Sequence, residues 1–229
     1  MKARNNSIQK LSQAAKPIGY WGRISARIMA IAHRTIYKNV AAALNLQPED
    51  DFLEIGCGSG IFMKLYASHV RSITGLDHSE DMVKLAIHYN RKRVEEGTAE
   101  FRQGEASELP WEDEKFSAAA AIATFMFWPK PLKSLKEIYR VLRPGGRLVI
   151  SLGWNADDGM DHSKHVKKYG IRLYTGKEMQ AMFQEAGFSK SSITYSKGFM
   201  MPKLMIARAV KQQLTPRVSS SSVGSVRVF

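Results

Sequence analysis

The sequence predicts an α/β fold in which helices flank a largely parallel sheet. Between residues 51 and 209, short apolar runs alternate with segments whose apolar residues recur at helical spacing. The first run, Phe52-Leu53-Glu54-Ile55, breaks into Gly56-Cys57-Gly58-Ser59-Gly60, and a helix is expected from about Ile61. A chain of 229 residues suffices for one such domain with a modest extension.

The elements of the first half follow from periodicity and from stop signals. Apolar residues recur at spacings of three and four from Ile24, which predicts an amphipathic helix to about Leu46: Ile24, Ile28, Ile31, Ala32, Ile36, Val40 and Leu44. Strands are expected at 51–55, 72–77 and 99–103, with helices at 61–69 and from Ser79 to about 96, where Gly97 ends the second.

The second half continues the alternation. The run 116–122 is rich in alanine and uncharged, as a central strand buried on both faces can be. A helix over 133–142 ends at Pro144-Gly145-Gly146, and strand 147–152 follows. After a long insertion at 153–173 we expect a helix over 175–186 and strands at 191–196 and 203–209, the last antiparallel.

These segments divide the chain into four parts. Residues 1–16 are expected to be a flexible basic arm, 17–47 an N-terminal helical cap, 48–210 the main domain, and 211–229 a disordered, Ser-rich tail.

The net charge of +13 is concentrated in the termini. Residues 1–47 hold 8 Lys/Arg and residues 190–229 hold 7, and neither part has an acid, so the middle of the chain sums to −2. A nucleic-acid enzyme usually carries its basic stripe beside its active site. Nucleic acid is therefore an alternative partner and not the favoured one, and solvated tails are the simpler interpretation.

The cysteine count and the lack of long apolar segments indicate the cellular compartment. The single cysteine, Cys57, excludes an internal disulfide and a multi-thiolate metal site, which fits a reducing compartment. No secretory signal is visible, and the longest charge-free apolar run, 117–129, is too short for a membrane span. We expect a cytoplasmic protein, with an organellar transit peptide as the alternative.

The glycine loop predicts a ligand seat, because glycines let a ligand lie against bare main chain beside the N–H groups of the next helix. Gly56-x-Gly58-x-Gly60 places its third glycine one residue earlier than a dinucleotide-binding turn does. Glu54 at the strand end would repel a pyrophosphate but suits an ammonium or hydroxyl group. E-x-G-x-G-x-G resembles motif I of the class I S-adenosylmethionine (SAM) dependent methyltransferases.

Later motifs strengthen this resemblance. Asp77 ends a strand 17 residues after Gly60, where an acid can accept hydrogen bonds from ribose hydroxyls. Gly104-Glu105-Ala106 resembles the family's Gly-Asp-Ala with a longer acid, and Leu-Arg-Pro-Gly-Gly at 142–146 is typical of the superfamily. Together they resemble the methyltransferase type 11 domain family, which implies a Rossmann-like sheet of seven strands.

The resemblance implies SAM as cofactor and S-adenosylhomocysteine as product, with no metal. The residues that it assigns to the cofactor lie at the ends of the first four strands: Glu54, Gly56, Cys57, Gly58, Gly60, Asp77, His78, Met82, Gly104, Glu105, Ala106 and Ala123. Cys57 is read as a small packing residue of the loop, and Met82 can serve the core and the adenine at once.

Methyl transfer by SN2 displacement needs alignment more than covalent help from the protein. Aromatic residues near the same edge of the sheet suggest a wall for a small, partly apolar acceptor: Tyr20, Trp21, Phe127, Trp128, Trp154 and Tyr169. His33, His162 and His165 are candidates for a general base, if the acceptor needs one.

Three other functions stay open. The protein could methylate RNA or protein by using its basic termini, although the Asn/Asp-Pro-Pro-Tyr signature of amino-methylating nucleic-acid enzymes is missing. It could be a binding module without turnover. The third and least favoured function is that of an NAD-dependent dehydrogenase. The sequence leaves the acceptor, the methylated atom and the oligomeric state open.

Overall fold

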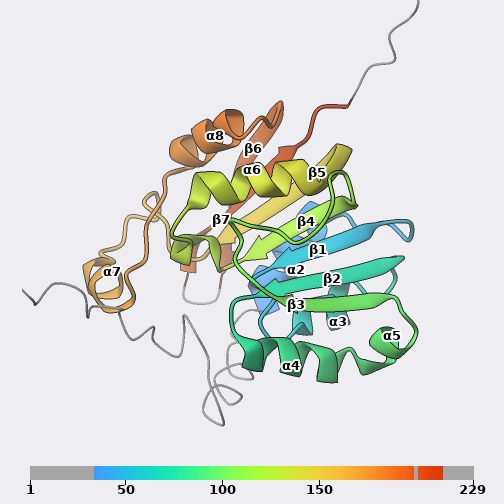
Figure 1. The fold of residues 1–229 in the computed structure, drawn as a ribbon. Helices are drawn as coiled ribbons and strands as arrows, with labels where there is room; N and C mark the ends of the chain where they lie inside the picture. Colours follow the sequence, from blue (N-terminus) through green and yellow to red (C-terminus); the bar gives the residue numbers. More distant parts are fainter. Residues whose placement is uncertain (1–33, 199–200, 214–229) are drawn as a thin grey trace, which may run out of the picture.

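A computed structural model describes residues 34–198 and 201–213 of the chain (Figure 1). The predicted arm at 1–16, most of the cap at 17–47, and the tail from 214 lie outside the described residues. In the described part, no helix is both long and apolar enough to span a bilayer.

The structure contains a seven-stranded sheet in the order β3-β2-β1-β4-β5-β7-β6. The strands are β1 (Asp51–Ile55), β2 (Ser72–Asp77), β3 (Ala99–Gln103), β4 (Phe116–Ile122), β5 (Leu142–Leu152), β6 (Lys190–Gly198) and β7 (Met201–Val210). The pairs among β1 to β5 are parallel, and β7 is antiparallel to both of its neighbours, as predicted. The strand order changes direction between β1 and β4, which is where open parallel sheets bind ligands.

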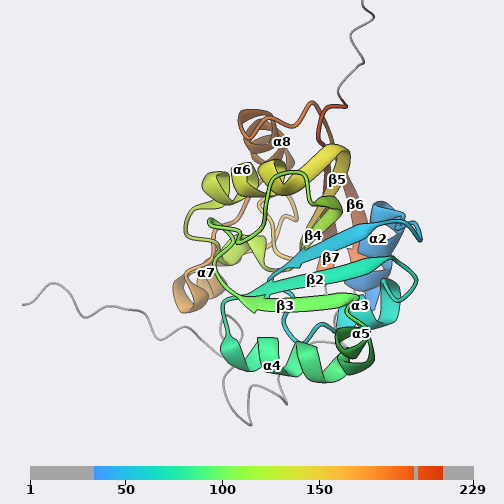
Figure 2. The same ribbon diagram turned by 45° about the vertical axis from the view of Figure 1, so that its right-hand side comes forward.

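Helices cover both faces of this sheet. They are α2 (Arg34–Leu44), α3 (Ile61–Tyr66), α4 (Glu80–Tyr89), α5 (Arg91–Glu95), η1 (Phe125–Phe127), α6 (Pro131–Val141), α7 (Ser163–Tyr169) and α8 (Gly176–Glu185). One core cluster joins one face of the sheet to α2, α3 and α4, and a second joins the other face to α6 and α8 (Figure 2). α7 projects beyond the end of the sheet (Figure 1).

Three boundaries differ from the predictions by three residues or more. The helix expected to run to residue 96 breaks at Asn90, whose buried amide donates to the carbonyl oxygens of Gly60 and Ala86. Strand β5 begins at Leu142, before the predicted start at 147, because Leu142 pairs with Phe116 across a bulge. The helix expected over 61–69 ends at Tyr66.

Ser117 belongs to a hydrogen-bond network at the amino ends of the strands. Its hydroxyl donates to Asp50 and accepts from the backbone N–H of Asp51. Asp50 also binds Arg147, while Asp51 binds Arg71 and Arg143. This network joins β1, β4 and β5 at the edge opposite the glycine loop.

Candidate functional site

The glycine loop between β1 and α3 has the backbone conformation that its sequence predicts. Gly56, Gly58 and Gly60 all have positive φ, at 71°, 52° and 68°. A Cβ on Gly56 would lie 2.6 Å from the Thr124 side chain, whereas a Cβ on Gly58 would meet nothing within 4 Å. Gly56 is therefore required by packing, while Gly58 exposes bare backbone to open space.

Neighbouring strands hold the loop in place. The backbone N–H groups of Gly56 and Cys57 both donate to the carbonyl of Leu76, at 2.7 and 3.0 Å. Cys57 is buried, and burial together with nearby acids raises the pKa of its thiol well above the ordinary value. A protonated, buried thiol is a packing group and a poor nucleophile.

Glu54 is a buried acid with an incomplete set of partners. Its side chain lies at the end of β1, the residue is 3% exposed, and Oε2 has no hydrogen-bond partner among the described residues. Burial, together with the charge of Asp77, raises the pKa of this carboxyl well above its ordinary value. A buried acceptor without a partner carries a free-energy penalty that a cationic or donor group of a ligand would remove.

Asp77 at the end of β2 joins the second strand to the loop. Its Oδ2 accepts from the backbone N–H of Gly58 at 2.8 Å, and its Oδ1 accepts from the N–H of Ser79 at 2.9 Å. The Nδ1 of His78 lies 3.5 Å from Oδ1. A carboxylate offers about four acceptor positions, so Asp77 can accept further hydrogen bonds.

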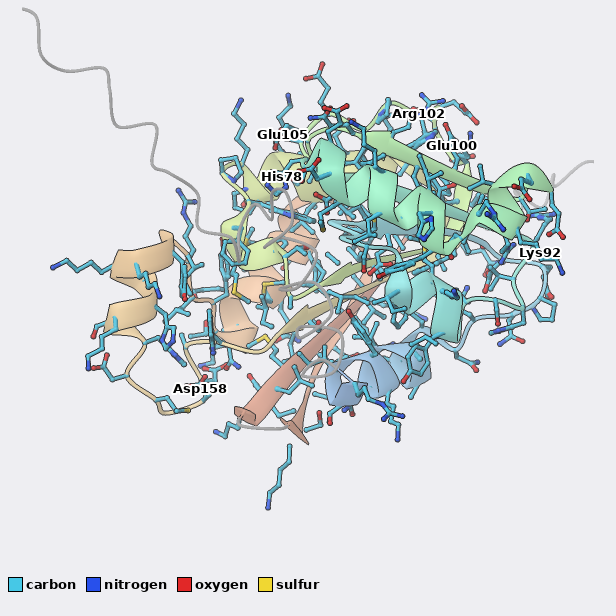
Figure 3. The ribbon with its side chains drawn as sticks, turned by 90° about the horizontal axis from the view of Figure 1, so that it is seen from below. His78, Lys92, Glu100, Arg102, Glu105 and Asp158 are labelled. Atoms are coloured by element: carbon cyan, nitrogen blue, oxygen red, sulfur yellow. The ribbon has the colours of Figure 1, made fainter. Side chains whose placement is uncertain are left out.

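The end of β3 completes this side of the site. The N–H of Gly104 donates to the Asp77 carbonyl at 2.9 Å, and Gln103 Nε2 donates to the His78 carbonyl at 3.2 Å. These bonds place Glu105 beside His78 at the start of α4 (Figure 3). The side chain of Glu105 is exposed, whereas Met82 and Ala106 are buried.

The end of β4 forms the other wall of the loop. Ala123 has an unusual positive φ of 55°, and its N–H lies within hydrogen-bonding distance of both the Ser151 carbonyl, at 3.1 Å, and the Ser151 hydroxyl, at 3.2 Å. The Thr124 hydroxyl donates to the Ile55 carbonyl at 3.2 Å. Strained backbone of this kind collects at functional sites.

Four of the predicted acceptor-side residues form one aromatic cluster on the 153–173 insertion. The Trp154 ring lies 4.4 Å from His165, 6.1 Å from Tyr169 and 6.3 Å from His162, measured between centroids. His162 is 4% exposed, and its Nε2 lies 2.7 Å from Asp158 Oδ2. The Nδ1 of His165 is buried without a hydrogen-bond partner among the described residues.

The remaining aromatic residues have different positions. Phe127 is partly buried in η1, while Trp128 is 8% exposed and packs on Phe125 as part of the core. Tyr20, Trp21 and His33 lie outside the described residues.

The sequence reasoning missed two residues that organise the site. Asp158 fixes His162, and the spacing of four residues between acid and imidazole was a usable signal. Asn90 holds the Gly60 carbonyl from 30 residues away, and no local pattern indicates that contact.

The strand order, the glycine loop and the acids that end β1 and β2 together define a class I SAM-dependent methyltransferase. More narrowly, residues 53–150 match the model of a methyltransferase domain family, Methyltransf_11.

Relatives agree with this assignment. The chain is 27% identical to the uncharacterized methyltransferase YdaC of Bacillus subtilis over 195 residues, which cover 84% of this chain and 99% of that protein. It is 28% identical to the 2-phytyl-1,4-beta-naphthoquinone methyltransferase of Arabidopsis thaliana chloroplasts, covering 79% and 80% of the two chains. A solved SAM-dependent methyltransferase from Thermotoga maritima superposes with a TM-score of 0.64 at 25% identity, covering 83% and 96%.

Proposed function

We propose that this methyltransferase binds SAM on the glycine loop and transfers its methyl group by SN2 displacement to a small, partly apolar acceptor. The observation that carries the proposal is the convergence of two buried carboxylates, Glu54 and Asp77, on an open stretch of loop backbone at Gly58. Two acids at one loop favour a cationic ligand over a diphosphate.

The residues present fit this cofactor. The unpartnered Oε2 of Glu54 would accept from the ammonium group of the methionine part. The remaining acceptor positions of Asp77 would take the ribose hydroxyls, and Glu105 would accept from the adenine amino group. Open space at Gly58 leaves room for the ligand against the main chain.

When bound, SAM supplies an electrophilic methyl group on a positively charged sulfur that becomes neutral as the methyl leaves. The protein's contribution is then orientation, for which effective molarity can supply roughly 7–11 kcal/mol of the barrier. Side chains that exclude water favour the loss of charge in the transition state. Glu54 and Asp77 would fix the cofactor at the glycine loop, and the acceptor must be held beside its methyl group.

The aromatic cluster on the insertion is the proposed acceptor side. Trp154 and Tyr169 are stacked within 12° of parallel and are partly buried, so they offer flat apolar surface next to the core. Among the predicted base candidates we favour His165, because its Nδ1 lacks a partner whereas His162 is bound to Asp158. For a hydroxyl acceptor, His165 would take the proton as oxygen gains the methyl group. The quinone substrate class of the Arabidopsis relative supports an apolar acceptor.

Incubation with metabolite extracts and SAM carrying an isotopically labelled methyl group tests the proposal. We expect label in a small organic product, and none with the Asp77→Ala variant. Label in RNA or protein would support the alternative acceptors instead. A protein that binds SAM but labels nothing would behave as a binding module and would contradict the proposed transfer.

A further inference from the structure

The insertion between β5 and α8 carries a basic and apolar surface that the transfer reaction does not use. We define the α7 surface as Met160, Lys164, Val166, Lys167 and Lys168. All three lysines are exposed, and Met160 and Val166 are 53% and 39% exposed. Within the described part of the chain, none of the three lysines forms an ion pair.

The internal packing of α7 determines which side chains face outward. His165 and Tyr169 are four residues apart on one face of the helix, and both lie against Trp154. Lys167 therefore lies on the opposite face with Lys164 beside it, while Val166 flanks the packed face. Lys168 lies over the outer side of the Tyr169 ring, 5.0 Å from its centroid.

The local charge is mainly positive. Residues 162–177 hold five Lys/Arg and no Asp or Glu. Of the preceding acids, Asp158 is buried against His162 and Asp157 accepts from Gly176 and Tyr195, whereas Asp161 is exposed at the N-terminal end of α7. Asp161 compensates part of the positive charge of α7, but the three lysines still outnumber it, and the helix lies beyond the end of the sheet (Figure 1).

Hydrogen bonds hold the loop before α7, which favours one orientation of this surface. Asn155 donates to the Lys203 carbonyl at 2.7 Å, Asp158 accepts from the N–H of Met160 at 2.8 Å, and Asp161 accepts from the N–H of Ser163 at 2.8 Å. A surface that is preorganised loses little conformational entropy on binding.

We propose that the α7 surface docks on an anionic lipid membrane. Lysines provide attraction to acidic headgroups, and apolar side chains among them can enter the interface, which is the combination typical of membrane-surface segments. The exposed Met160 and Val166 favour a lipid over a nucleic acid, because a phosphate backbone offers them nothing to bury against. Docking does not depend on the proposed acceptor, but it would bring the aromatic cluster next to a source of apolar molecules.

Co-sedimentation of the full chain with phosphatidylcholine vesicles, with and without phosphatidylglycerol, tests docking. We expect binding only when phosphatidylglycerol is present. Each lysine near such a surface contributes about fivefold, so replacing Lys164, Lys167 and Lys168 by Gln should weaken partitioning on the order of 100-fold.

A matched control changes the net charge equally at sites outside the α7 surface. Lys92, Lys136 and Lys190 are exposed, and Lys92 lies at the opposite end of the molecule from α7 (Figure 3). Their triple replacement by Gln should weaken binding less than about fivefold. Equal losses in the two triple variants would overturn the proposal, since they would indicate attraction by total charge or by other basic segments.

The apolar contribution is measured separately. Met160→Ser combined with Val166→Ser should weaken vesicle binding about tenfold and leave its salt dependence unchanged. Full vesicle binding by this variant would contradict docking by insertion. Binding of RNA, but not of vesicles, that depends on the three lysines would assign the surface to nucleic acid and refute the lipid proposal.

Discussion

Replacing Glu54 by Gln should move stability and cofactor affinity in opposite directions. The substitution keeps the shape of the side chain and removes its charge. In the free protein, burial and the charge of Asp77 raise the pKa of Glu54, so the folded state binds a proton more readily than the unfolded state. Stability from this group therefore falls as pH rises above about 4.5, the ordinary value, towards the raised pKa.

The expected changes in stability and in SAM affinity are both large enough to measure. Glu54→Gln removes a buried charge, and the ligand-free variant should be more stable than the wild type at pH 8 by about 1 kcal/mol, or roughly 2–4 °C in melting temperature. The difference should disappear near pH 4.5. A hydrogen bond to a charged group contributes about 1.5–3 kcal/mol, so SAM should bind roughly 10- to 150-fold more weakly.

Calorimetry in two buffers of different ionisation enthalpy adds a specific signature. An ammonium group beside Glu54 lowers the pKa of its carboxyl, so the wild type should release a proton on binding SAM wherever the free protein still holds one. The Gln variant should release none. Glu108→Gln, at an exposed acid outside the site, is the control and should behave as the wild type. Unchanged SAM affinity and proton release in Glu54→Gln would refute the assigned role.

Three further predictions concern the loop, the sheet and the insertion. Gly56→Ala should destabilise the fold by about 2–5 kcal/mol in urea unfolding, because a Cβ there would lie 2.6 Å from the Thr124 side chain. Gly58→Ala should lower the free energy of unfolding by only about 1–2 kcal/mol, the cost of its positive φ, but should weaken SAM binding. The pKa of Asp51 is lowered to about 2, because hydrogen bonds from Arg71, Ser72 and Arg143 outweigh the effect of its burial. The ionised carboxylate should therefore contribute about 2 kcal/mol to the free energy of unfolding above pH 4. That contribution is lost as pH falls from about 4 to 2, so the stability difference between wild type and Asp51→Asn should vanish there. Asp158→Asn should raise the KM for the acceptor and leave the Kd for SAM unchanged, since it loosens the aromatic cluster without touching the loop.

Much of the fold could be predicted from the sequence because its central strands are short, apolar and separated by strong stop signals. β1, β2, β3 and β4 begin and end where periodicity predicted. The break at Asn90 and the early start of β5 could not be predicted, because both depend on contacts with residues distant in the sequence.

In the candidate site, too, the sequence predicted the residues set by local pattern and missed the arrangement set by distant contacts. Glu54, Asp77 and the glycines carry spacing that follows from backbone conformation, so local pattern was enough to bring them together. The acceptor side depends on how the insertion folds: Trp128 packs into the core, while Trp154, His165 and Tyr169 form a cluster that a linear pattern does not specify.

A crystal structure of the full chain, grown with SAM and NAD both present, tests the central claim most directly. We expect SAM on the glycine loop, with its ammonium group within hydrogen-bonding distance of Glu54 and its ribose hydroxyls on Asp77. Density for a dinucleotide on the glycine loop, or SAM bound away from both carboxylates, would contradict it.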